Sequence, residues 1–191
     1  MKALLLDGTR AGQESPNDLP ETIADELTNA GWDVESLNLK RMRIAYCLGC
    51  FQCWTKTPGV CRMNDDGREV ARRIVASDLV VLFTPVTFGG YSSEIKKALD
   101  RVICVVSPFF MKVGGEIHHK PRYERYPRII GLGVLPEPDD ESEAIFQTLV
   151  RRNALNLHAP GCGAAVVYDN DEAAVVRERV RSLLGELEGE R

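Results

Sequence analysis

Short apolar runs alternate with helical patterns along this chain, and the alternation predicts an α/β fold. The run 79–83 is unbroken and rich in β-branched residues, as in a strand covered on both faces of a parallel sheet. Similar buried strands are predicted over 2–7, 128–134 and 162–168, whereas 32–39 alternates apolar and polar residues like an edge strand. Five strands alternating with helices predict a doubly wound parallel sheet in the order 2-1-3-4-5.

The segments between these strands carry the periodicity of amphipathic helices. After the central strand, apolar residues recur with a 3.6-residue period from Ile95 to Ile103, so a helix capped by Ser92 or Ser93 is predicted to pack on the sheet. Asp66 is predicted to cap another helix, over 66–77. Right-handed crossovers would bring the loops after the first, third and fourth strands to one crevice.

Composition narrows the class of protein. The chain has 191 residues, which suits one α/β domain, and its net charge of -4 argues against a nucleic-acid surface. The apolar run 3–6 is too short for a signal-peptide core, and no stretch reaches membrane-spanning length. These features predict a cytoplasmic location, no membrane partner, and six cysteines kept reduced.

A compact cysteine motif is the strongest chemical signal. Four cysteines spell C-x2-C-x2-C-x7-C, and adjacent x2 spacings strain a disulfide, so a metal is favoured. Structural zinc usually takes two separated pairs, whereas this spacing is that of cubane clusters, which favours [4Fe-4S]. Zinc, redox-active thiols and inert cysteines are the alternatives. The predicted ligands are Cys47, Cys50, Cys53 and Cys61. Cys104 and Cys162 are interpreted as buried small hydrophobes.

Residues 84–101, TPVTFGGYSSEIKKALDR, combine a TPV-x-F-GG loop with a K-x-x-D-R helix end. This string resembles the flavin-ring loop of the flavodoxin-like NAD(P)H-dependent FMN reductases. The cysteine motif, between the second strand and the helix before that loop, is similar to that of the iron-sulfur flavoproteins within the superfamily. The resemblance covers nearly the whole chain, most strongly 47–101. It implies one flavodoxin-like FMN-binding domain over 1–191, with a cysteine-rich insertion at 44–63.

The resemblance also implies where FMN would bind. The loop 8–17 precedes a helix N-terminus, which suits a phosphate, and the flavin ring would lie between 84–90 and a second wall at 134–137. Ring stacking would involve Phe88, Tyr91 or Trp54. The expected cofactor-binding residues are Thr9, Arg10, Ser15, Asn17, Thr84, Pro85, Val86, Thr87, Phe88, Gly89, Gly90 and Leu135.

The implied activity is that of an FMN-dependent oxidoreductase or electron-transfer flavoprotein. NAD(P)H or a ferredoxin would donate electrons, and a quinone, a flavin or an oxygen species would accept them. No catalytic side chain is expected, because the flavin carries the chemistry. Homodimers or dimers of dimers are expected. The alternatives are a flavodoxin-like electron carrier without its own substrate, a cluster-free zinc or free-thiol NAD(P)H:FMN or quinone reductase, and a fold that binds no flavin.

A long connection at 107–127 mixes aromatic and basic residues. Connections of this length are usually functional lids or disordered. Its aromatic residues are expected to cover the flavin or pack on a second subunit, and its cations to meet nicotinamide-cofactor phosphates. A solvated loop is the alternative.

Overall fold

A single parallel sheet forms the centre of the molecule. The computed structural model describes residues 1–10 and 18–189. The sheet order β2-β1-β3-β6-β7 confirms the predicted 2-1-3-4-5 topology, and every neighbouring pair is parallel. The strands are β1 (Lys2–Asp7), β2 (Asp33–Asn38), β3 (Leu79–Pro85), β6 (Arg128–Leu135) and β7 (Cys162–Tyr168).

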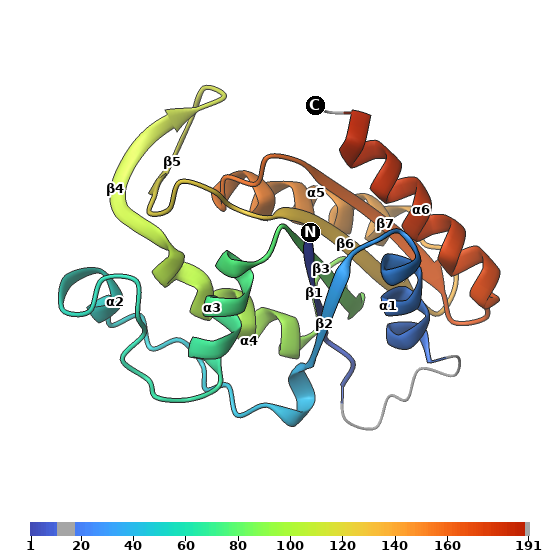
Figure 1. The fold of residues 1–191 in the computed structure, drawn as a ribbon, viewed down its shortest axis with the longest axis horizontal. Coiled ribbons are helices and arrows are strands. Elements are labelled where there is room, and N and C mark those ends of the chain that lie inside the picture. Colours follow the sequence, from blue (N-terminus) through green and yellow to red (C-terminus); the bar gives the residue numbers. More distant parts are fainter. Residues whose placement is uncertain (11–17, 190–191) are drawn as a thin grey trace.

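Helices cover both faces of the sheet (Figure 1). They are α1 (Leu19–Asn29), α3 (Gly67–Ala76), α4 (Ser93–Arg101), α5 (Asp140–Asn156) and α6 (Ala173–Gly189). Leu5 and Val81 of the strands pack with α1 and α6, whereas their neighbours Leu4 and Val80 pack with α3, α4 and α5. None of the helices in the described part of the chain is long and apolar enough to cross a membrane.

The segment 107–127, expected as a long irregular connection, instead contains a β-hairpin. Strands β4 (Val106–Val113) and β5 (Glu116–Pro121) form a separate two-stranded antiparallel sheet that projects from the body (Figure 1). Gly114 and Gly115 make its turn with φ of 57° and 86°, the conformation that two-residue hairpins favour. A Gly-Gly pair between β-prone residues was the sequence signal for this hairpin.

Short elements link the sheet to its helices, and the two predicted helix caps have different outcomes. Ser92 caps α4, with its Oγ accepting from the Ile95 amide at 3.3 Å, as predicted. Asp66 does not cap α3 with its side chain, because its carboxylate accepts from the Arg43 amide at 2.6 Å. The short elements are η1 (Leu39–Arg41), α2 (Gln52–Thr55) and η2 (Val102–Val105).

Candidate functional site

Loops that follow three sheet strands meet at one edge of the sheet. After β1, the Arg10 guanidinium donates to the Thr87 hydroxyl, which follows β3, at 3.4 Å. The Val86 amide donates to the carbonyl of Val134 on β6 at 2.8 Å. The predicted crevice beyond the carboxyl ends of the first, third and fourth sheet strands is therefore formed by the loops that the topology assigned to it.

The junction between β3 and α4 is held by two fully buried hydroxyl groups. The Thr84 hydroxyl accepts from the Ser92 amide at 2.8 Å and donates to the Pro85 carbonyl at 2.9 Å. Ser92 in turn caps α4. Because both groups are satisfied inside the protein, the loop between them is fixed at both ends.

Residues 87–90 form a tight turn at the tip of this loop. Thr87 and Gly90 exchange two backbone hydrogen bonds of 3.0 and 2.9 Å, while Phe88 and Gly89 have φ of 50° and 70°. A Cβ on Gly89 would lie 2.4 Å from Cγ2 of Ile145, so only glycine fits there. The Phe88 side chain is 96% exposed, so the turn presents an aromatic ring and bare backbone to the solvent.

At the end of β1, both oxygens of the Asp7 carboxylate accept hydrogen bonds, whereas one N–H of the Arg10 guanidinium has no partner in the described residues. The Asp7 carboxylate accepts from the Thr9 amide at 2.9 Å, from the Thr9 hydroxyl at 2.5 Å and from the Asn38 side-chain amide at 2.6 Å. Nε of Arg10 is buried and finds no partner among the described residues. A buried guanidinium N–H with no protein partner suits an anion such as a phosphate.

The other predicted flavin-site residues differ in their placement. Leu135 is buried in the apolar core. Tyr91 is also buried and accepts a 3.1 Å hydrogen bond at its hydroxyl from Asn153, which leaves Phe88 as the exposed ring of the loop. Ser15 and Asn17 lie outside the described residues.

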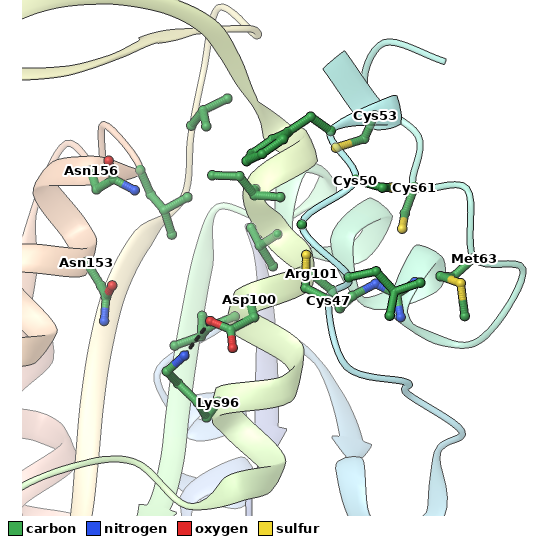
Figure 2. A pocket seen from close by; sticks show the side chains of 18 of the residues that line it. Cys47, Cys50, Cys53, Cys61, Met63, Lys96, Asp100, Arg101, Asn153 and Asn156 are labelled. Carbon is green, nitrogen blue, oxygen red and sulfur yellow. Dashed lines mark hydrogen bonds and ion pairs between the residues drawn. The ribbon is translucent and has the colours of Figure 1, made fainter. Parts of the chain in front are cut away.

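A cavity of about 750 Å³ lies beside α4 and reaches from the cysteines to the turn after β3. We call residues 46–64 the cysteine loop. All of the predicted metal ligands line this cavity, together with Gly90 and Tyr91. Figure 2 shows the cysteines on one side of α4 and Asn153 and Asn156 of α5 on the other. Among the described residues predicted to bind FMN, Gly90 alone lines this cavity, so the cysteine site meets the predicted flavin loop at the last residue of its turn.

The four thiols are neighbours but do not form a coordination sphere. Cys47 and Cys50 are exposed, Cys61 is half-buried and Cys53 is buried. The pKa of Cys53 is raised, first by burial and then by the nearby Cys61, Cys47 and Cys50. Within residues 1–10 and 18–189, no three His, Cys, Asp or Glu side chains are arranged to hold a metal ion. The donor set fits a thiolate-bound metal or cluster, but ligation requires the sulfurs to move closer together.

Aromatic rings join the cysteine loop to the β-hairpin. The indole N–H of Trp54 donates to the carbonyls of Ile103 and Val106 at 3.1 and 3.0 Å. Its ring stacks on Phe51 with centroids 5.0 Å apart and contacts His119 of β5 at 4.9 Å. Trp54 thus anchors the loop to the body of the protein and is not free to stack on a flavin.

Arg101 is the site residue whose role the sequence pattern did not predict. It is almost fully buried, forms an ion pair with Asp65 at 2.7 Å, and lines the cysteine cavity. A signal existed: Arg101 follows Ala98 by one helical turn, on the buried face of α4. A charged residue on a buried helix face indicates a paired or functional group.

The sheet order and the crevice together define a flavodoxin-like fold. The chain belongs to the NADPH-dependent FMN reductase family, whose model matches residues 1–123. The family resemblance drawn from 84–101 is therefore confirmed.

Two relatives that match more than half of the chain carry the name iron-sulfur flavoprotein. The chain is 31% identical over 103 residues to an iron-sulfur flavoprotein of Archaeoglobus fulgidus, covering 54% of this chain and 46% of that protein. It is 28% identical over 119 residues to an iron-sulfur flavoprotein of Methanocaldococcus jannaschii, covering 61% of each chain. The chain thus spans about half the length of the curated relatives it matches.

Solved structures share the fold over nearly the whole chain. An NAD(P)H:quinone oxidoreductase from Methanothermobacter marburgensis has a TM-score of 0.69 at 14% identity, covering 95% of this chain and 96% of that one. An FMN-dependent NADH-azoreductase from Bacillus anthracis, solved with FMN, has a TM-score of 0.60 at 11% identity, covering 96% and 99%. At these identities the likeness shows the fold.

Proposed function

We propose that this chain is an FMN-dependent oxidoreductase that is reduced by NAD(P)H, with a [4Fe-4S] cluster held by Cys47, Cys50, Cys53 and Cys61 beside the flavin. The observation that carries the proposal is the shared cavity, which the cysteines and the end of the turn 87–90 both line. The family match and the iron-sulfur flavoprotein relatives support the same assignment.

FMN would be held by the crevice at the edge of the sheet. Arg10 offers the phosphate a guanidinium whose buried Nε has no partner among residues 1–10 and 18–189, and the turn 87–90 offers bare backbone and the Phe88 ring. Bound FMN supplies hydride-transfer and single-electron chemistry. The protein's part is to fix these contacts, through the buried hydroxyl groups of Thr84 and Ser92.

The cluster would be held by the cysteine loop. Three thiols in x2-x2 register and one after a short helix are the donors that a cubane requires. Bound, the cluster supplies one-electron transfer. Because the free thiols are not yet in coordination geometry, we expect cluster loading to order the cysteine loop, as metal binding commonly does for its ligand segments. A reducing cytoplasm would keep these thiols available.

Anaerobic purification tests both halves of the proposal. We expect a coloured protein with stoichiometric FMN, iron and sulfide, which oxidises NAD(P)H when a quinone is added. Zinc in place of iron would favour the cluster-free reductase. Bound flavin without NAD(P)H oxidation would favour an electron carrier or a ferredoxin-reduced protein. A colourless protein would exclude the flavin role.

We expect Arg10→Gln to weaken FMN binding about tenfold or more, because a hydrogen bond to a charged group contributes about 1.5–3 kcal/mol. Fluorescence titration of the flavin-free protein with FMN measures the dissociation constant. Arg128→Gln is the matched control, since Arg128 begins β6 at the opposite end of the sheet. Equal affinities of the Arg10 variant and the wild type would contradict the assignment of Arg10 to the phosphate.

The hairpin supports a proposal of a homodimer or a dimer of dimers. Phe109, Phe110 and Ile117 are exposed on β4 and β5, and apolar side chains gathered on one arm usually mark an interaction surface. Sedimentation of the wild type should give a dimer or a tetramer, and Phe110→Glu should shift it toward smaller species. A monomeric wild type would contradict the proposal.

A further inference from the structure

Arg101 is buried in an unusual place for a cation. Its side chain is at the end of α4 with 1% exposure, and burying an unpaired guanidinium is strongly unfavourable. Nη2 and Nη1 therefore donate to the two oxygens of Asp65, at 2.7 and 2.8 Å. Nη1 also donates to the Ala45 carbonyl at 2.8 Å.

These partners are the two ends of the cysteine loop. Ala45 immediately precedes residues 46–64 and Asp65 immediately follows them. The Asp65 carboxylate also accepts from the Ala45 amide at 3.0 Å and from the Gly67 amide at 3.1 Å. Arg101 and Asp65 thus close the neck of the loop that carries all of the predicted sulfur ligands, and they fasten that neck to α4.

The guanidinium also has an unused donor. Arg101 lines the cysteine cavity, and its Nε is buried with no partner in the described part of the chain. Leaving a buried donor unpaired is costly, so an unmet N–H beside a cavity indicates a ligand. An arginine guanidinium is not deprotonated in proteins, so Arg101 keeps its positive charge beside the cavity.

We propose that Arg101 is the positioning residue of the cysteine centre: it closes the neck of the cysteine loop and sets a fixed positive charge and a free N–H beside the sulfur ligands. The second half rests on the proposed cluster. Four thiolates give such a cluster a negative charge, and one-electron reduction makes it more negative. A buried cation and a hydrogen bond to sulfur favour the reduced form, so Arg101 raises the reduction potential of the cluster.

The test compares Arg101→Gln, Arg101→Lys and the wild type, each loaded with iron and sulfide. A dithionite titration with redox mediators, followed by electron paramagnetic resonance, gives the midpoint potential. We expect Arg101→Gln to lower the equilibrium constant for one-electron reduction about tenfold, or about 59 mV. Arg101→Lys should fall in between, because lysine keeps the charge but loses the bidentate fork.

Lys96→Gln is the matched control. Lys96 carries another cation of α4 on the same cavity, but its side chain is largely exposed and pairs with Asp100 (Figure 2). Solvent screens its charge, so we expect the potential of Lys96→Gln to stay close to that of the wild type. If Lys96→Gln shifted the midpoint potential as much as Arg101→Gln does, the effect would not be specific to Arg101 and the proposal would be overturned. An unchanged potential in Arg101→Gln would overturn it too.

A second readout needs no iron. In the metal-free protein, we expect Arg101→Gln to speed amide hydrogen exchange of 45–67 at least about tenfold while the sheet strands keep their protection. Unchanged exchange would overturn the closing of the neck. If the wild type takes up no iron, the proposed cluster and the proposed effect of Arg101 on it both fail. Hydrogen exchange in the metal-free protein then tests whether Arg101 closes the neck of the cysteine loop. If Arg101→Gln does not fold, Arg101→Lys supplies both comparisons.

Discussion

Replacement of Cys50 by serine is expected to remove iron from the purified protein and to leave its FMN content unchanged. Cys50 is exposed, so the substitution disturbs no packing, whereas Cys53 is buried. A serine hydroxyl does not ionise as a thiol does and is a poor ligand for iron. Loss of one ligand should lower bound iron at least about tenfold, because even outer partners of metal ligands contribute 10–100-fold to metal affinity.

Iron, sulfide and FMN per chain, measured after anaerobic purification, decide the outcome. Cys162→Ser is the matched control, since Cys162 is half-buried at the start of β7 and does not line the cysteine cavity. The control should keep both cofactors. Iron retained in Cys50→Ser would mean that this thiol is not a ligand, whereas loss of FMN together with iron would mean that the two sites fold as one unit.

The second large effect is expected from Gly89→Ala. Alanine at φ of 70° costs about 1–2 kcal/mol, and its Cβ would meet Ile145 at 2.4 Å, which adds about 1–3 kcal/mol of overpacking. We expect the free energy of unfolding to fall by about 2–5 kcal/mol in urea titrations of the flavin-free protein. FMN affinity should fall too, because the turn 87–90 must shift to relieve the contact.

Gly114→Ala separates backbone strain from the clash. Gly114, in the hairpin turn, also has a positive φ, of 57°, but a Cβ added there would meet no atom within 4 Å. Backbone strain alone should lower the free energy of unfolding of this control, by about 1–2 kcal/mol, and its FMN affinity should stay unchanged. If Gly89→Ala and Gly114→Ala lowered stability and FMN affinity by the same amounts, the contact between the turn and Ile145 would not constrain the flavin loop.

The sequence by itself determined the sheet and the placement of its loops. Buried strands such as 79–83 are covered on both faces and therefore lack polar alternation, which made them recognisable without any tertiary contact. The parallel order and right-handed crossovers then fixed which loops share the crevice, so Arg10 and Thr87 could be assigned to one site before their contact was known. Local spacing likewise limited the cap of α4 to Ser92 or Ser93, and the structure shows that it is Ser92.

Only the tertiary structure decided what depends on contacts between distant segments. The Gly-Gly turn of the hairpin at 106–121 was present in the sequence, but the antiparallel pairing of its strands and their register were decided by the structure. The neck formed by Arg101 and Asp65, and the cavity that joins the cysteines to the turn after β3, depend on packing of α4 against the cysteine loop. Periodicity and spacing report the neighbours of a residue along the chain, whereas a buried ion pair is selected by its partners across the fold. This is why the ligand types were readable in the sequence and their surroundings were not.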